Sequence, residues 1–330
     1  MITKYMAEHD FIGATVTESL DGGLMLMYSS VDGKHFFKSF DNFHTVAEEW
    51  IVPIDSITAN ANLLRLNGGK LMTVVRRISE NPTIAEIDGA SFYTYFSDDD
   101  GHSFYEGAKI NSRDACYYLM NNRILRTDTG RILIPMCYVP HELADMEHFE
   151  KSGLSGCFYS DDEGQSWQEG EWLSEESVDQ LAEPMVVKGA SGELHMYMRT
   201  GHGYLYHSVS HDDGVSWEKA QASELRSACA PFCVNFDPFS KQYLVIWDNC
   251  FPGPHQNYPR SPICIAKSRD CESWEMMCEL DKDPMRSYGY PLLYFTEKEI
   301  IVAYYEAPGR RFDKEHQRLK VKIFSREELI

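Results

Sequence analysis

Three short acidic segments hold the most regular group of chemically active side chains in this sequence. They read SDDDGHSF at 97–104, SDDEGQSW at 160–167 and SHDDGVSW at 210–217. Clustered carboxylates could bind calcium, but that ion takes about six to eight oxygen ligands and this pattern does not supply a full loop of them. Asp instead accepts hydrogen bonds from its own turn, and Gly adopts a positive φ. The pattern therefore predicts a repeated structural turn.

Other groups suited to acid–base or metal chemistry are scattered over predicted loops. Histidines and carboxylates follow short apolar runs at His141, Glu142, His202, His207, Asp248 and His255. Cys229 and Cys233 could ligate a metal, but no second cysteine pair lies at zinc-like spacing. We therefore predict no metal site and no cofactor, and no phosphate loop, zinc-protease pair or nucleophile elbow is present.

The elements that must position these groups repeat along the chain. A β-like run precedes each acidic turn, as in SFYTYF at 91–96 and YLYHSV at 204–209. Degraded copies of the turn follow at Ser268, Ser39 and Ser325, so that the serines recur every 50 to 63 residues. Upstream of each turn lie two apolar runs joined by a short turn, which predicts a hairpin.

Six units of four strands account for nearly the whole chain. Radial repetition of four-stranded sheets at this period is typical of a β-propeller, whereas a solenoid has a shorter period and needs capping units. We therefore predict an all-β, six-bladed propeller formed by residues 1–330 as a single domain. The chain ends after the third strand of its last unit, so the N-terminal run KYMAEHDFI is expected to close that blade.

Composition indicates which kinds of partner and which cellular compartment suit the protein. The 330 residues have a formal net charge of −20, which disfavours nucleic acid and anionic membranes as partners. No run approaches the roughly 20 apolar residues of a membrane span, and the first residues do not resemble a secretory signal. Nine scattered cysteines, an odd number, are best interpreted as reduced thiols. We therefore expect a cytoplasmic protein.

The Ser-x-Asp-x-Gly-x-Ser-aromatic turn resembles the Asp-box, or BNR repeat, of the sialidase superfamily. The resemblance covers nearly all of the chain and implies a sialidase-like propeller. It is less specific for the reaction, because Asp-boxes also occur in non-catalytic propellers, other glycosidases and lyases.

Sialidases share an arginine triad that holds the sugar carboxylate, a tyrosine nucleophile beside a glutamate, and an aspartate acid/base. A neutral tyrosine avoids repulsion by a carboxylate on the anomeric carbon, and the glutamate can take its proton. The segment AEPMVVKGASGELHMYMR resembles the family segment that contains the glutamate and one arginine, here Glu183 and Arg199. Similar matches imply Arg260 for another triad position and Tyr290 for the nucleophile. Arg286 and Tyr288 are expected on the pocket rim.

Two family positions are not matched. The first triad arginine aligns with Ala59, and Arg76 and Arg77 at the end of the following strand are candidates to compensate. The acid/base aspartate should lie in SENPTIAEIDGAS, where Glu86 and Asp88 are the candidates.

The resemblance implies an exo-acting, retaining glycosidase that acts on an oligosaccharide or small glycoside and removes a sialic-acid-like or other sugar. Two alternatives stay open. One is a non-catalytic propeller that binds glycans or a protein. The other is a propeller hydrolase or lyase that uses carboxylates and histidines in place of the tyrosine.

Overall fold

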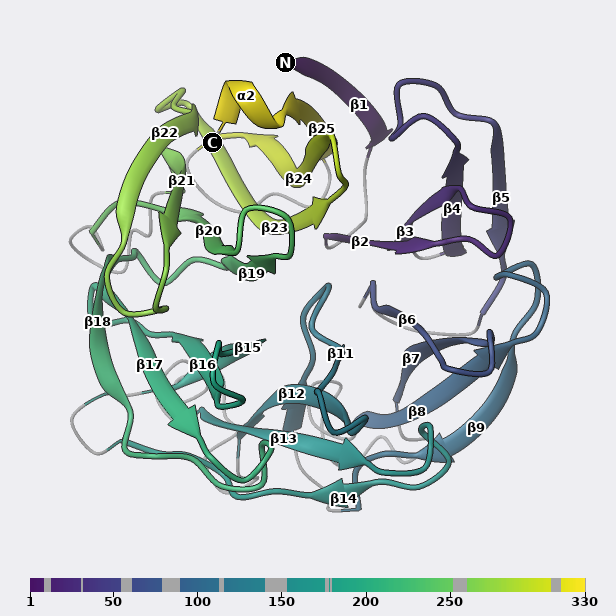
Figure 1. Ribbon diagram of the computed structural model, residues 1–330, viewed down its shortest axis with the longest axis horizontal. Helices are drawn as coiled ribbons and strands as arrows, with labels where there is room; N and C mark the ends of the chain where they lie inside the picture. Colours follow the sequence, from purple (N-terminus) through teal and green to yellow (C-terminus); the bar gives the residue numbers. More distant parts are fainter. Residues whose placement is uncertain are drawn as a thin grey trace.

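The computed structural model describes residues 1–8, 13–30, 32–54, 61–78, 90–112, 116–139, 153–175, 178, 180–251, 260–309 and 316–329. Within these ranges, six antiparallel sheets surround a central axis, and the chain passes from one sheet to the next around the ring (Figure 1). The predicted all-β, six-bladed propeller is therefore confirmed.

The first three blades follow the chain order. Blade 1 contains β2 (Ala14–Glu18), β3 (Leu24–Ser30), β4 (Gly33–Ser39) and β5 (Glu48–Val52). Blade 2 contains β6 (Leu63–Arg65), β7 (Leu71–Ile78), β8 (Ala90–Ser97) and β9 (Tyr105–Lys109). Blade 3 has a divided inner strand and contains β10 (Cys116–Tyr118), β11 (Leu125–Arg126), β12 (Ile132–Val139), β13 (Leu154–Ser160) and β14 (Gln168–Glu169).

The last three blades complete the ring. Blade 4 contains β15 (Ala182–Lys188), β16 (Leu194–Arg199), β17 (Tyr204–Ser210) and β18 (Gln221–Arg226). Blade 5 contains β19 (Cys233–Asp237), β20 (Gln242–Asp248), β21 (Ile263–Ser268) and β22 (Glu275–Asp281). Blade 6 contains β23 (Arg286–Phe295), β24 (Glu299–Pro308), β25 (Arg318–Ser325) and β1 (Ile2–Glu8).

Blade 6 joins the two ends of the described chain. Strand β1 lies antiparallel to β25, with a register that runs from Ile2 opposite Ile323 to Glu8 opposite Arg318. The short helix α2 (Arg326–Leu329) follows β25, and both termini lie on the same side of the ring (Figure 1). The edge of β25 is thus covered by a strand from the other end of the sequence.

Apolar side chains between neighbouring blades form the core. One cluster joins Leu205 of blade 4, Val245 of blade 5 and Val302 of blade 6, each 0% exposed. Another joins Leu26 of blade 1 to Ile301 of blade 6. The aromatic and β-branched runs form strands here because each sheet buries both faces against its neighbours.

The repeated acidic turn has one hydrogen-bond pattern. In the 160–167 copy, Asp162 Oδ1 accepts hydrogen bonds from Ser160 Oγ at 2.8 Å and from Ser166 N at 2.9 Å, while Oδ2 accepts from Ser166 Oγ at 2.5 Å. Gly164 N donates to Ser160 Oγ at 2.8 Å, and Gly164 has a φ of 80°. The aspartate oxygens serve the turn itself, as expected for a structural motif.

The glycine of each turn also packs against the preceding blade. A Cβ on Gly164 would lie 2.7 Å from Met72 Sδ in blade 2, and one on Gly214 would lie 2.8 Å from Leu133 in blade 3. The turn therefore needs glycine both for its backbone conformation and for close contact between blades. This explains why the sequence repeats it.

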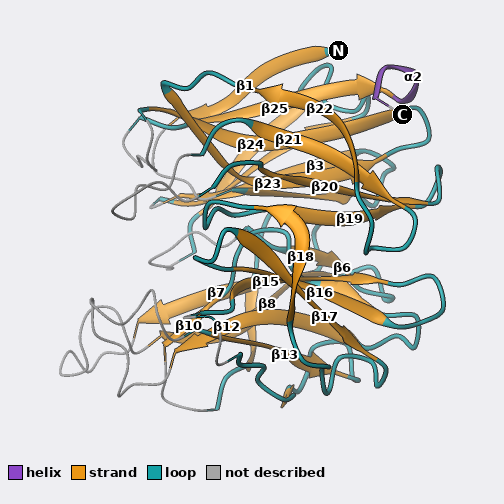
Figure 2. Ribbon diagram, turned by 90° about the vertical axis from the view of Figure 1, so that its left-hand side faces the viewer, coloured by secondary structure: helices purple, strands orange, loops and turns teal. Residues whose placement is uncertain are grey.

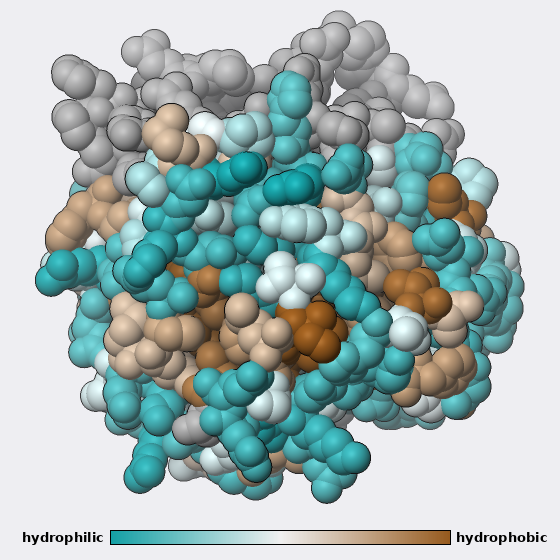
Figure 3. Space-filling model, turned by 90° about the horizontal axis from the view of Figure 1, so that it is seen from above, coloured by the Kyte–Doolittle hydropathy of each residue, from teal (hydrophilic) through white to brown (hydrophobic). Residues whose placement is uncertain are grey.

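Seen from the side, the strands run between the two faces of the ring (Figure 2). The first-to-second-strand hairpins and the acidic turns lie on one face, which we call the acidic-turn face. First strands begin and second strands end on the opposite face, which we call the site face. On the side that carries the N-terminus, hydrophilic residues surround small hydrophobic patches (Figure 3).

Candidate active site

Glu183 and Tyr290 lie at similar irregularities of two inner strands, Glu183 as the second residue of β15 and Tyr290 within β23. Glu183 has a φ of 47° and Tyr290 a φ of 48°, a left-handed conformation that is uncommon for residues with a side chain. A register shift spans each of them, between Ala182 and Met185 in one blade and between Gly289 and Leu292 in the other. Such strain, of about 1–3 kcal/mol per residue, concentrates at functional sites.

The same backbone conformation recurs around the axis. Gly13, Asn122 and Cys229 precede or open the inner strands of blades 1, 3 and 5, with φ of 64°, 54° and 56°. Each of these residues precedes the inner strand of its blade, β2, β11 or β19. The fold thus presents several side chains at or near its inner strands, and the side chain at each position determines its chemistry.

Arg199 connects two of these left-handed residues. It ends β16 and pairs with Ala182, which places its guanidinium beside the neighbouring Glu183. Nη1 donates to Glu183 Oε1 at 2.5 Å, and Nε donates to Cys229 Sγ at 3.2 Å. Glu183 is only 9% exposed, so this is a largely buried, charge-assisted hydrogen bond.

Arg260 lies against two tyrosines of blade 6. Its Nη1 donates to Tyr305 Oη at 2.7 Å, and its guanidinium carbon is 5.9 Å from the centre of the Tyr290 ring. The rings of Tyr290 and Tyr305 are 5.9 Å apart, centre to centre. Residues from blades 5 and 6 therefore form one contiguous polar group.

The environment of Tyr290 favours a neutral phenol that can be activated. Burial raises its pKa, the Glu183 carboxylate raises it further, and the guanidiniums of Arg260 and Arg199 oppose the rise. Glu183 Oε2 is buried and has no hydrogen-bond partner. A carboxylate oxygen with open acceptor capacity thus lies in electrostatic contact with a protonated tyrosine.

Asp248 is a further acidic group at this face. It ends β20 as Arg199 ends β16, it is 0% exposed, and neither carboxyl oxygen has a hydrogen-bond partner. Burial raises its pKa well above the usual range, against the opposing charges of Arg260 and Arg199. From the sequence, Asp248 was only one of several loop residues that could serve in acid–base or metal chemistry.

The segment between β10 and β11 extends into the middle of the ring (Figure 1). Asn121 Nδ2 donates to Ala14 O of blade 1 and, at 3.3 Å, to Tyr290 O of blade 6. Arg123 Nη2 donates to Phe232 O of blade 5 at 3.0 Å. Sequence reasoning missed this segment; the adjacent Asn121 and Asn122 were the available signal, because Asn is depleted in strands.

Arg123 supplies a buried positive charge near the candidate pair. It is 2% exposed and also contacts Met185 Sδ at 3.1 Å, two residues after Glu183. Burial lowers its pKa, while Glu183 and Tyr290 are among the groups that favour its charged form. This guanidinium was not among the predicted site residues.

The structure shows the surroundings of the two residues expected on the pocket rim. Tyr288 is 1% exposed, belongs to the core of blades 4 to 6 and packs edge-on against Tyr304. Arg286 lies at an edge of blade 6, within 3.7 Å of Glu306 and 3.9 Å of Asp283. The irregular register of β23 after Gly289 separates the side chains before it from Tyr290, and simple strand alternation could not reveal this.

The two arginines that were expected to compensate for Ala59 have partners on blades 2 and 3. Arg77 pairs with Glu106 at 2.5 Å and lies over the Tyr95 ring, within its own blade. Arg76 faces blade 3, with its guanidinium carbon 5.9 Å from the centre of the Tyr118 ring. The structure thus gives Arg77 a partner within blade 2 and places Arg76 at the junction with blade 3.

Several predicted residues fall outside the described ranges. They are Ala59, Glu86, Asp88, His141, Glu142 and His255. Of the other histidines, His207 lies within blade 4, where its Nε2 is 2.9 Å from His195 Nδ1. His202 is exposed in the turn after β16.

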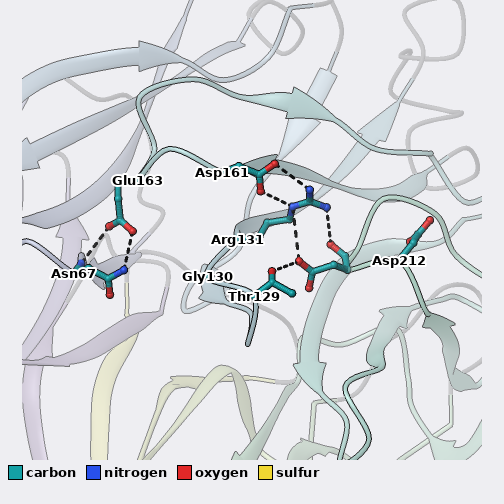
Figure 4. A pocket seen from close by; sticks show the side chains of 8 residues that line it. Asn67, Thr129, Gly130, Arg131, Asp161, Glu163 and Asp212 are labelled. Carbon is teal, nitrogen blue, oxygen red and sulfur yellow. Dashed lines mark hydrogen bonds and ion pairs between the residues drawn. The ribbon is translucent and has the colours of Figure 1, made fainter.

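A pocket of about 640 Å³ opens on the acidic-turn face. Figure 4 shows its lining, which consists of Asn67, Thr129, Gly130, Arg131, Asp161, Glu163, Asp212 and Asp213. Arg131 forms an ion pair with Asp161 at 2.7 Å, and Glu163 forms one with Arg126 at 2.6 Å. The charged side chains of this pocket therefore pair with one another and connect neighbouring turns. The pocket lies on the face opposite Tyr290 and contains none of the predicted catalytic residues.

The described residues offer no group of three or more His, Cys, Asp or Glu side chains able to hold a metal ion. Within the same ranges, no helix has the length and apolar character needed to cross a membrane.

Comparison with known proteins identifies both a family and a fold. Residues 47–302 match the family model described as a BNR repeat-like domain. The structure is similar to a Hadza microbial sialidase, with a TM-score of 0.72 and 15% identity over 97% of this chain and 66% of that one. It is equally similar to the intramolecular trans-sialidase from Ruminococcus gnavus, with a TM-score of 0.72 and 14% identity over 99% of this chain and 97% of that one.

A third similar structure is an alpha-L-arabinanase from Penicillium chrysogenum, solved with arabinobiose. Its TM-score is 0.72 at 11% identity, over 100% of this chain and 99% of that one. At these identities the similarity shows the fold alone. This chain therefore shares its propeller fold with sialidases and with an arabinanase.

Proposed function

Because the chain belongs to the family of BNR repeat-like domains, we propose that it is a glycoside hydrolase of the sialidase type. It removes a terminal sugar from an oligosaccharide or small glycoside with retention of the anomeric configuration. The observation that carries this proposal is the grouping of Tyr290, Glu183 and two arginines on the site face, although they come from three blades.

In the first step, the Tyr290 oxygen attacks the anomeric carbon while Glu183 Oε2 accepts the phenolic proton. The glycosidic bond breaks, and the leaving oxygen takes a proton from an acid, for which the sequence offers Glu86 and Asp88. The open acceptor capacity of Glu183 Oε2 and the raised pKa of Tyr290 support this assignment, because the phenol stays protonated until the glutamate takes its proton.

In the second step, water loses a proton to the group that served as the acid, and its oxygen attacks the anomeric carbon. The bond to Tyr290 breaks, and the phenolate regains its proton from Glu183. Two displacements at one carbon restore the original configuration.

The arginines support the pair in different ways. Arg199 holds Glu183 through the 2.5 Å hydrogen bond and so fixes the carboxylate that must accept the proton. Arg260 contributes positive charge beside Tyr290, which opposes the effect of burial on the phenol and favours the phenolate leaving group. Both guanidiniums can also attract an anionic sugar.

We further propose that the protein acts in the cytoplasm. All nine cysteines are free thiols, which suits a reducing compartment. Cell fractionation with an antibody against the native protein tests this proposal, and recovery from an oxidising compartment would refute it.

A panel of fluorogenic aryl glycosides that includes the α-sialoside tests the activity. We expect release of the aryl group from at least one member by the wild-type protein and a loss of orders of magnitude in Tyr290→Phe. Tyr288→Phe is the matched control, since it removes the phenolic oxygen of a buried tyrosine of the same strand that packs in another part of the core. Equal activity of Tyr290→Phe and Tyr288→Phe would exclude the tyrosine mechanism and favour carboxylate chemistry.

A further inference from the structure

Asp248 is an acidic side chain of blade 5 whose oxygens have no partner in the described chain. It is completely buried, and both of its carboxyl oxygens have no hydrogen-bond partner. Another buried carboxylate of blade 5, Asp237, shows the usual arrangement, with Arg326 at 2.5 Å and Ser240 at 2.6 Å. Buried polar groups in proteins usually form hydrogen bonds. A fully buried acid whose two oxygens have no partner therefore needs a ligand or an ordered water to form those hydrogen bonds.

The groups around Asp248 define what such a ligand must be. Arg199 at the end of β16 and Arg260 before β21 both act on its charge, yet neither forms an ion pair with it. The nitrogen and oxygen atoms of an ion pair lie within about 4 Å of each other. The guanidinium nitrogens are therefore farther than that from the Asp248 oxygens. A small polar group that contacts both sides would satisfy the acid and the arginines together.

The remaining neighbours of Asp248 stay uncharged. Burial raises the pKa of Cys250 in the following segment and of Cys264 in β21 to about 12. Burial also raises the pKa of Tyr305 in β24, where Arg260 opposes the rise. Within this set Asp248 is the carboxylic acid, and burial disfavours its charged form while Arg260 and Arg199 favour it.

We propose that Asp248 is a third contact of the substrate clamp and donates its own proton to the carboxylate of an acidic sugar held by Arg199 and Arg260. The inference rests on the proposed glycosidase function and specifies its substrate as a sugar acid. An O–H to carboxylate hydrogen bond is short and strong, and it supplies the contact that the sequence lacks at Ala59.

The protonation of Asp248 then controls binding. Below its pKa in the folded protein, the neutral acid donates a hydrogen bond and leaves the arginines to the ligand. Above that pKa, its charge repels the ligand carboxylate and competes for the same guanidiniums. Because burial raises this pKa, the binding-competent state extends to higher pH than for an ordinary aspartate.

Calorimetric binding of N-acetylneuraminate and of glucuronate, measured across pH, tests the proposal. We expect the affinity of the wild-type protein for at least one acid to fall as pH rises, by up to about tenfold per pH unit. Asp248→Asn, whose amide donates a weaker hydrogen bond at every pH, should bind more weakly than the wild type at low pH and lose this pH dependence. The matched control Asp237→Asn changes a buried carboxylate of the same blade and should keep the wild-type profile.

A wild-type affinity that does not change with pH, or an unchanged slope in Asp248→Asn, would overturn the inference. If neither acid binds at any pH, the inference is also wrong, while release of a neutral aryl sugar by the same preparation would leave the proposed hydrolase standing. Conversely, binding that follows the expected profile without hydrolysis of any glycoside would support the clamp and refute the hydrolase.

If Asp248→Asn does not fold, infrared difference spectra of wild-type protein labelled with carbon-13 aspartate decide the question. A carboxylic-acid band that disappears over the pH range in which binding is lost supports the proposal. The absence of any such band while binding changes would contradict it.

Discussion

Replacement of Glu183 by glutamine should separate the two roles that the structure gives this residue. The carboxylate accepts a 2.5 Å hydrogen bond from Arg199 in a setting where only 9% of the residue is exposed. A hydrogen bond to a charged group contributes about 1.5–3 kcal/mol, and breaking a buried ion pair costs about 3–5 kcal/mol. Glutamine keeps an acceptor, so we expect a loss of about 1.5–3 kcal/mol in the free energy of unfolding.

Comparison with smaller side chains isolates the backbone strain. Alanine removes the acceptor and should cost about 3–5 kcal/mol. Glycine removes it too, but it tolerates the φ of 47°, so Glu183→Gly should be about 1 kcal/mol more stable than Glu183→Ala. Urea denaturation of the three variants measures these differences. Equal stability of the alanine and glycine variants would contradict the strained conformation.

The same glutamine variant tests the proton transfer. Because an amide cannot take the Tyr290 proton, turnover should fall by about 10²–10⁴-fold on whichever aryl glycoside the panel identifies. A double-mutant cycle with Arg199→Gln should give a coupling energy of about 0.5–3 kcal/mol. Turnover within a few-fold of wild type, or strictly additive effects, would refute the reasoning.

Three further outcomes follow from the fold. Deletion of residues 1–8 exposes the edge of β25 and should lower the free energy of unfolding by roughly 3–5 kcal/mol, and an unchanged denaturation midpoint would argue against β1 as a structural strand. Asp162→Ala leaves turn donors without partners and should cost about 1–3 kcal/mol by the same assay, whereas intact folding with loss of a calcium-dependent activity would support a metal role instead. Arg123→Met should keep stability within about 2 kcal/mol but reduce kcat by about tenfold, because it removes positive charge near Tyr290, and an unchanged kcat would exclude that electrostatic role.

The repeat made the architecture predictable from sequence. Apolar runs of fixed order, separated by a turn whose glycine contacts the preceding blade, leave few alternatives to a ring of sheets. Strand order also explains why Glu183 and Arg199 meet, because one begins a strand and the other ends its antiparallel partner.

Side-chain partners within the site were harder to predict, for physical reasons. The register shift after Gly289 separates Tyr288 from Tyr290, and an alternation rule assumes a regular strand. Arg77 pairs with a carboxylate and lies over an aromatic ring in its own blade. The spacing of residues in the sequence does not reveal that such partners compete with a role in the site. Asn121 fills the centre of the ring through contacts with blades distant in sequence.

The central claim is that Tyr290 forms a covalent bond with the sugar. Incubation with a fluorinated glycosyl fluoride, 3-fluorosialyl fluoride first and then the analogue of any sugar that the panel identifies, should slow the second step and accumulate the intermediate. Mass spectrometry of the intact protein and its peptides should then show one added glycosyl unit, located on Tyr290 and absent from Tyr290→Phe. A label on a carboxylate, or full turnover of the reagent through Tyr290→Phe, would contradict the account.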